Sequence, residues 1–150
     1  MVEIMEPSDW VIVPEINCCG VQLNEKQRFM GINPETAVNM TDFTPHSSPE
    51  IREKLFPERK LLERQGNSML TSLISPEECA LFSASEIAVE GKFQFRNPAS
   101  FAIGAVVEGS LNFGGVELPQ GGNFFLPHAV KELEISGNGR VILIRPPKIS

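Results

Sequence analysis

Short apolar segments, separated by turn residues at nearly regular intervals, fill the second half of the sequence. Between about residues 68 and 147 lie runs such as "SMLTSLI", "KFQFR", "NFFLP" and "RVILIRP", each bounded by Gly, Pro, Asn or Ser. Apolar and polar residues alternate at Phe93/Phe95 and at Leu133/Ile135, which is the period of a half-buried strand. Regular short strands with turn signals predict a sandwich or jelly roll. The run "RVILIRP", apolar on both faces, is predicted to be a central strand.

The residues before this zone have a different pattern of predicted secondary structure. The stretch "VEIMEPSDWVIVPEI" has two short extended runs broken at Glu6-Pro7, in which Val11 and Val13 favour a pleated surface. Residues 24–66 are predicted to form short helices packed on another part of the protein. Their apolar side is expected to comprise Phe29, Met30, Val38, Ile51, Leu55 and Phe56.

Three polar residues are predicted to begin these helices. Asn24 precedes "EKQRFM", Asn33 precedes Pro-Glu, and Ser48 precedes Pro-Glu again. Asn and Ser accept hydrogen bonds from the first free backbone N–H groups of a helix, and proline suits its first turn. Farther along, the sign-alternating run "REKLFPERKLLER" is predicted to be a solvated helix face.

Composition excludes several classes of partner and location. Lys and Arg number 13 against 19 Asp and Glu, a net charge of -6, whereas nucleic-acid binding needs clustered cations. No apolar run approaches the ~20 residues of a membrane span, and the first residues do not have the pattern of a signal peptide. Cys18, Cys19 and Cys79 are odd in number, and adjacent cysteines bridge only under strain. We therefore expect a soluble protein of a reducing cytoplasm, with structural cysteines.

The segment "FAIGAVVEGSLNFGGVELPQGGNFFLP" resembles the core of the cupin superfamily. A strand ends in Glu108-Gly109, a hairpin turns at Gly114-Gly115, and Gly121-Gly122 leads into a strand closed by Pro127. Both glycine pairs join strands, so they are predicted to be turn glycines with positive φ and not a phosphate loop. The resemblance implies a mainly β fold: a cupin-like jelly-roll barrel preceded by a short helical segment.

The N-terminal stretch "VEIMEPSDWVIV" narrows the resemblance to one family. It is similar to the segment of class I mannose-6-phosphate isomerases that follows the last metal-binding histidine of their catalytic cupin. That family continues with helices and a C-terminal cupin-like domain, in the same order as here. The chain thus resembles the C-terminal half of the family. The implied parts are remnant strands of an upstream cupin (1–23), a helical segment (24–66) and a C-terminal barrel (67–150).

The family converts an aldose phosphate into a ketose phosphate with zinc held by a Gln-x-His pair, a glutamate and a later histidine. All four ligands would lie upstream of the point that matches Met1. Glu3 falls on an acidic position near the family's active site and is the one catalytic residue that the resemblance implies. Ser8-Asp9 falls on its Ser-Asp pair. The arginine expected four residues after that aspartate, which helps to hold substrate charge, is replaced by Val13.

The barrel is predicted to hold neither metal nor other cofactor. A metal-binding cupin supplies His-x-His and a glutamate before the Glu-Gly turn and a histidine some residues after the proline. Here "RNPASFAIGAVV" has no such donor before Glu108, His128 follows Pro127 out of register, and the only other histidine is His46. Zinc needs about four converging donors. The interior is predicted to be filled by Phe93, Phe95, Phe101, Val107, Phe113, Phe124 and Leu126.

Two functions are compatible with this sequence. The first is the C-terminal portion of a mannose-6-phosphate isomerase-like protein, inactive alone, with a catalytic cupin domain or a second copy of the chain as partner. The alternative is a metal-free, non-catalytic cupin module that binds a carbohydrate, such as a sugar phosphate, or a partner protein. Lys92, Arg96 and Arg145 could contact a phosphate, but scattered cations on a β surface are usually solvated. A cupin enzyme with a different metal site is a third class.

Overall fold

The structure is a computed structural model that describes residues 2, 4, 11–56, 58–98 and 100–147. The chain divides into two compact units, one within Ile4–Arg52 and one within Glu53–Ser150 that also takes in Met1–Glu3. We call them the N-terminal unit and the barrel unit, and each is described by itself. None of the helices in the described ranges has the length and hydropathy that a membrane span requires.

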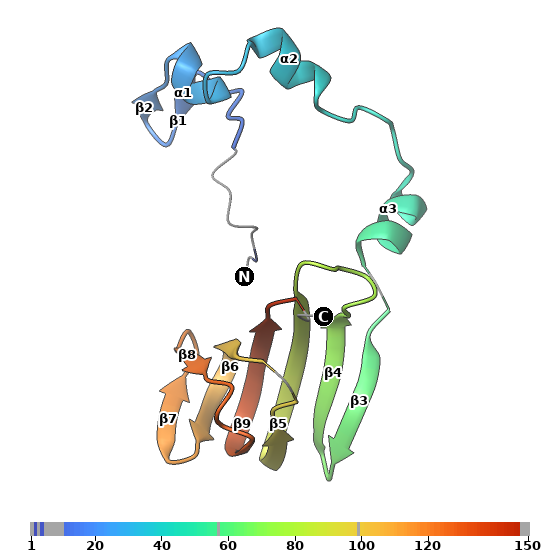
Figure 1. Ribbon diagram of the computed structural model, residues 1–150, viewed down its shortest axis with the longest axis vertical. Coiled ribbons are helices and arrows are strands. Elements are labelled where there is room, and N and C mark those ends of the chain that lie inside the picture. Colours follow the sequence, from blue (N-terminus) through green and yellow to red (C-terminus); the bar gives the residue numbers. More distant parts are fainter. Residues whose placement is uncertain (1, 3, 5–10, 57, 99, 148–150) are drawn as a thin grey trace. The chain divides into compact units, whose positions relative to one another are not determined.

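The barrel unit is built on one antiparallel sheet. Its strands run in the order β3-β4-β5-β9-β6-β7, and β8 pairs with the first part of β6 (Figure 1). β9 lies between β5 and β6, so the predicted central position of "RVILIRP" is confirmed. The strands are β3 (Lys60–Gln65), β4 (Ser68–Ile74), β5 (Ser83–Arg96), β6 (Ala102–Phe113), β7 (Val116–Pro119), β8 (Asn123–Leu126) and β9 (Glu132–Arg145).

Three of these strands are longer than the sequence predicts. Each of β5, β6 and β9 joins two runs that glycines appeared to separate. In the register, Gly91 lies opposite Gly137 and Gly109 lies opposite Gly139, so the glycines form a row across three strands. A Cβ on Gly109, whose φ is +70°, would lie 2.1 Å from the Asn138 carbonyl oxygen. The glycine row therefore bends the strands sharply without ending them.

This bend folds the sheet over on itself. Along the β5–β9 ladder, Arg145 pairs with Ser83 at one end and Phe95 pairs with Leu133 at the other. Nevertheless the Arg145 guanidinium carbon lies 5.6 Å from the centre of the Phe95 ring. The two ends of a long ladder can meet only if it curls back, so the inner faces of its halves enclose the core.

The core lies between these inner faces. It comprises Ile87, Val89, Phe93, Phe95, Ala102, Val106, Leu111, Phe113, Leu126, Ile135, Val141 and Leu143, with Phe124 partly buried against it. The prediction was wrong for Phe101, which is 40% exposed and packs on the outer face beside Phe125, at 5.4 Å between ring centroids. It was also wrong for Val107, which falls at a register shift between Val106 and Glu108 and is only half-buried.

The helical segment predicted for 24–66 ends earlier than expected. Helix α3 (Ser48–Leu55) is followed by strand β3, whose first residue is Lys60. The predicted helix face "REKLFPERKLLER" is therefore right only in its first part: Arg52 and Glu53 are exposed on α3, whereas the charges from Lys60 onward lie on an edge strand, because β3 forms a hairpin with β4. The cap of α3 is Ser47 rather than Ser48: the Ser47 N–H and hydroxyl both donate to Glu50 Oε2, at 2.7 and 2.8 Å.

In the N-terminal unit, local hydrogen bonds hold four short elements: β1 (Asn17–Cys18), β2 (Val21–Gln22), α1 (Glu25–Phe29) and α2 (Pro34–Asn39). Asn24 caps α1 and Asn33 caps α2, as predicted. Val11 and Val13 lie outside any strand, contrary to prediction; the Val13 N–H instead donates to the Arg28 carbonyl at 2.9 Å.

The predicted apolar side of the helices is mostly in contact with solvent. Among the described residues of the N-terminal unit, the buried apolar side chains are Phe29 and Ala37. Met30, Val38 and Ile51 are exposed, and so are Leu55 and Phe56 in the residues that follow; the list of six is therefore right for Phe29 alone. Helices of five to eight residues are too short to bury a continuous stripe by themselves.

Candidate functional site

The interior of the barrel is the natural place for a ligand in a fold of this kind. Side chains at the inward positions of β5, β6 and β9 are apolar, as Val89, Phe93, Val106, Leu111 and Val141 show. Metal binding needs nitrogen, oxygen or sulfur atoms that converge on one point. Across the described ranges, no three His, Cys, Asp or Glu side chains come together in a way that could hold a metal ion.

Glu108, in the Glu-Gly pair, is the carboxylate nearest in sequence to the positions where a metal-binding cupin has its ligands. The structure places it on the outer face of the sheet, because the bulge between Val106 and Glu108 shifts the register of β6. Its Oε2 lies 3.2 Å from Arg140 Nε, and both side chains are at least half-exposed. The Glu108 carboxylate therefore forms a surface ion pair and does not reach the interior.

The two histidines are far from forming a ligand set. His128 is exposed in the loop after β8, with its Nε2 2.9 Å from the Lys131 ammonium. His46 is exposed in the N-terminal unit. A histidine beside an ammonium group accepts a hydrogen bond from it, which occupies a lone pair that a metal would need.

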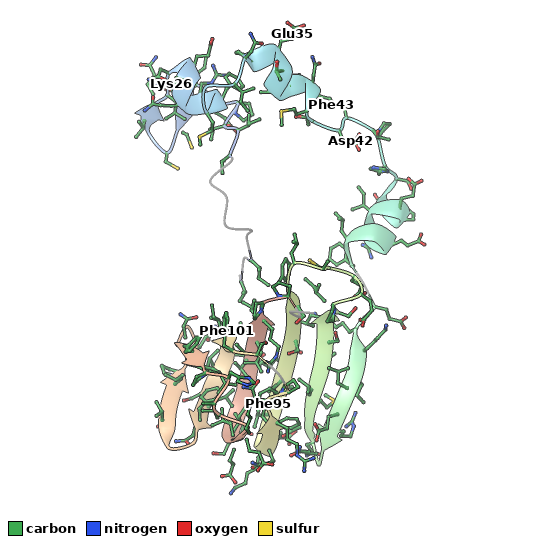
Figure 2. The ribbon with its side chains drawn as sticks, in the orientation of Figure 1. Lys26, Glu35, Asp42, Phe43, Phe95 and Phe101 are labelled. Atoms are coloured by element: carbon green, nitrogen blue, oxygen red, sulfur yellow. The ribbon has the colours of Figure 1, made fainter. Side chains whose placement is uncertain are left out.

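The most structured polar group lies where the last residues of β5 and β9 come together. Arg145 Nη1 donates to Asn97 Oδ1 at 2.8 Å and to the Ser100 carbonyl at 3.3 Å. Its guanidinium packs over the Phe95 ring, which Figure 2 shows among the strands. Burial lowers the pKa of Arg145 from its ordinary value, and its Nη2 is buried without a hydrogen-bond partner.

Asn97 connects this arginine to the neighbouring loop. Its Nδ2 donates to the Val130 carbonyl at 2.9 Å and to the Pro127 carbonyl at 3.3 Å, and its own N–H donates to the Lys131 carbonyl. The sequence pointed to Arg145 but not to Asn97. An Asn-Pro dipeptide directly after an alternating strand was the available signal, since Asn commonly bonds backbone groups in turns.

The other candidate cations lie on the outer face. Lys92 Nζ is 3.2 Å from a Glu134 carboxylate oxygen, and Arg96 Nε is 3.9 Å from Glu132. All four side chains are at least half-exposed, so these are surface ion pairs of small energetic weight.

The adjacent cysteines do not form a reactive site. Cys18 and Cys19 are free thiols with their sulfur atoms 4.0 Å apart. The hydrogen bond to Cys19 raises the pKa of the Cys18 thiol, which favours the unreactive protonated form.

Comparison with known proteins gives the family. A sequence profile described as "Mannose-6-phosphate isomerase, cupin domain" matches residues 71–146, half of the chain. The chain belongs to the mannose-6-phosphate isomerase cupin-domain family. The match begins inside β4 and includes all of β5 to β9, so it lies within the barrel unit and leaves out β3 and the first residues of β4. A search of curated proteins found no significant sequence match.

Solved structures share the fold. The mannose 6-phosphate isomerase from Bacillus subtilis is similar with a TM-score of 0.56 and 20% identity, over 83% of this chain and 37% of that one. This chain thus spans little more than a third of that enzyme. The polyketide cyclase RemF from Streptomyces resistomycificus (TM-score 0.48, 16% identity, 61% and 74% of the two chains) and the EutQ protein of Clostridium difficile (0.47, 18%, 59% and 76%) are also similar. The predicted fold class, a mainly β cupin-like barrel with helices before it, is confirmed.

The described residues of the barrel do not fit a zinc ion. Donors inside it would have to come from inward positions, which here carry apolar side chains, or from Glu108 and His128, which form contacts on the surface. Glu3, the implied catalytic residue, and Ser8-Asp9 lie outside the described residues. Beside Val13, where the resemblance would imply an arginine, the Arg28 guanidinium donates to the Pro14 carbonyl. The sequence had not indicated Arg28.

Proposed function

We propose that this chain serves as the non-catalytic C-terminal cupin part of a mannose-6-phosphate isomerase-like protein. The observation that carries the proposal is the apolar lining of a barrel that belongs to this family by sequence. A cupin domain whose inner face is filled by Phe93, Phe95 and Phe113 has packing side chains where a catalytic cupin needs donors. Its role is then to stabilise and complete the protein that carries the zinc site, and not to isomerise sugar itself.

The proposal predicts that the purified chain does not convert mannose 6-phosphate into fructose 6-phosphate. Zinc and mannose 6-phosphate would be added at neutral pH, and product followed by a coupled assay or by proton NMR. The mannose 6-phosphate isomerase from Bacillus subtilis, of which this chain covers 37%, is the positive control. Turnover by this chain at an enzyme-like rate, abolished by a chelator, would overturn the proposal.

A second candidate function is binding of a sugar phosphate beside Arg145, where the last residues of β5 and β9 come together. It is favoured by Arg145, whose Nη2 is a buried donor that nothing in the described residues satisfies. An anion reaching this atom would remove the cost of an unpaired buried donor. A rise in melting temperature with mannose 6-phosphate, lost in Arg145→Met but kept in Lys92→Met, would support binding. No shift in the wild type at millimolar ligand would exclude it.

A further inference from the structure

Three strands of the barrel sheet have an edge that pairs with nothing in the described part of the chain. β3 and β7 end the strand order, and β8 pairs with β6 alone. Such an edge presents unpaired backbone N–H and C=O groups, which can pair with a strand of another chain. Proteins protect these edges with charged side chains, proline or bulges.

The three edges are protected to different extents. β3 carries Lys60, Glu63 and Arg64, and its pairing with β4 is interrupted by a bulge. β7 is four residues long, contains Glu117 and ends at Pro119. β8 has the sequence Asn-Phe-Phe-Leu, with neither a charge nor a proline. Its short length is a further protective feature of an edge strand, and β8 shares this feature with β7.

An exposed apolar patch adjoins this unprotected edge. Phe125 of β8 is 62% exposed, and it lies opposite Ile103, which is 48% exposed. The Phe101 ring packs beside Phe125, and Figure 2 shows it at the end of the sheet near β6 and β8. We call Phe101, Ile103 and Phe125 the β8 patch. With 150–250 Å² for each aromatic side chain, its exposed apolar area is roughly 300 Å².

We propose that β8 pairs antiparallel with β8 of a second copy of this chain, so that two barrel sheets join edge to edge and bring the two β8 patches together at the junction. A two-fold interface is formed by the same surface of both copies. A charged edge would then meet its own charge, which costs several kcal/mol. β8 and the patch are uncharged, although the chain as a whole carries a net charge of -6. The charge distribution thus fits an identical partner.

The size of the patch sets the expected strength of the dimer. A stable protein–protein interface buries about 800 Å² on each partner, well above the roughly 300 Å² of the patch. Backbone pairing of two four-residue strands adds a limited number of hydrogen bonds. The dimer is therefore reversible, and its population rises with protein concentration.

Sedimentation velocity of the full chain over a wide concentration range tests the proposal. The wild type is expected to shift from monomer to dimer as concentration rises. Phe125→Lys puts like charges opposite each other and should raise the dissociation constant about tenfold or more. Leu62→Lys is the matched control, because Leu62 is 58% exposed on the edge strand β3. It should leave the dissociation constant unchanged.

Two further measurements separate lost pairing from lost folding. Far-UV circular dichroism and urea unfolding of Phe125→Lys should match the wild type, and Phe125→Ser replaces this variant if they do not. Amide hydrogen exchange in β8 should slow as the wild type dimerises. The proposal is overturned if the wild type stays monomeric at its highest soluble concentration. It is equally overturned if Leu62→Lys weakens association as much as Phe125→Lys does.

Discussion

The barrel unit and the N-terminal unit bury their apolar side chains to very different extents. In the barrel unit, Phe93 and Phe95 alternate with polar residues along one strand and are almost fully buried in a core of twelve residues. In the N-terminal unit, by contrast, Val38, Met40 and Phe43 are exposed (Phe43 is labelled in Figure 2). The same residue types thus have a structural role in one unit and are left in solvent in the other.

The difference shows what each unit depends on. A folded-over sheet provides two facing apolar surfaces, so the barrel unit is stabilised mainly by burial. The N-terminal unit has helices of five and six residues, and such helices are marginal without tertiary packing. Caps such as Asn24 and Asn33 supply much of its local order. We therefore expect the barrel unit to unfold cooperatively and the N-terminal unit to respond mainly to changes in its caps.

Substitution of one phenylalanine in each unit tests this comparison most strongly. Phe93→Ala leaves a cavity in the core, and the expected loss in the free energy of unfolding is about 3–5 kcal/mol. Phe43→Ala removes the same atoms from a side chain that is 73% exposed, so the loss should be below about 0.5 kcal/mol. Urea unfolding followed by circular dichroism measures both. Equal losses for the two variants would contradict the comparison.

The glycine row gives the next largest effect. In Gly109→Ala, a positive φ costs roughly 1–2 kcal/mol and the overlap with the Asn138 carbonyl adds about 1–3 kcal/mol. Gly91→Ala is the matched control, because Gly91 also has a positive φ but its Cβ would meet nothing within 4 Å. It should therefore cost only the roughly 1–2 kcal/mol of the positive φ. If both variants unfold at the same urea concentration, the close approach at the bend has no energetic role.

Asn97→Ala should have an intermediate effect. The change leaves Arg145 Nη1 with the Ser100 carbonyl alone and removes the Asn97 donor from the Val130 carbonyl, whereas the Pro127 carbonyl still accepts from the Val130 N–H. Unsatisfied buried groups cost about 1–3 kcal/mol, so we expect a loss of about 2 kcal/mol. A double-mutant cycle with Arg145→Met measures the coupling between the two side chains. Additive losses would show that the Asn97–Arg145 bond does not contribute.

Much of the barrel could be predicted because its strands alternate with period two. Phe93/Phe95 and Leu133/Ile135 indicate buried faces, and the turn at Gly114-Gly115 follows from the hairpin signal. The failures are also physical. Glycines at a bend and glycines at a turn look alike in a sequence, so the sequence predicts two short strands in place of each of β5, β6 and β9. The bulge at Val107 places Glu108 on the outer face, and no local sequence pattern predicts this bulge.

The candidate site was less predictable than the fold. Arg145 could be singled out as a cation, but its contacts with Phe95 and Asn97 arise because the sheet folds over, and these residues are about 50 positions apart in the chain. The exposure of Phe101 and Phe125 depends on which face of the sheet each side chain occupies. In the N-terminal unit, the cap of α3 was displaced by one residue because Ser47 and Ser48 are adjacent and chemically equivalent.

The smallest expected effect is a pH response of α3. At its start, as in one turn of the barrel unit, a serine N–H donates to the carboxylate of the glutamate three residues later. The Ser47 N–H donates to Glu50 and lowers the pKa of that carboxyl, and the Ser75 N–H likewise lowers the pKa of Glu78. A lowered pKa in the folded state stabilises that state above the carboxyl's ordinary pKa. This contribution is lost as pH falls through the lowered value. Acid should therefore weaken both turns.

The two turns should respond differently, because Ser75 is buried beside the sheet whereas α3 is exposed along most of its length. As pH falls below the ordinary range of glutamate, we expect the protection factors of the α3 amides, which are corrected for the intrinsic pH dependence of exchange, to decrease while those of β4 and β5 stay high. Glu50→Gln should remove most of the pH dependence of protection in α3, and Glu53→Gln, the same change on the same helix, should leave it intact. If protection in α3 is as pH-dependent in Glu50→Gln as in the wild type, the Ser47–Glu50 cap is not what holds this helix. If β4 and β5 open at the same pH as α3, the barrel depends on its carboxylates as much as the helix does.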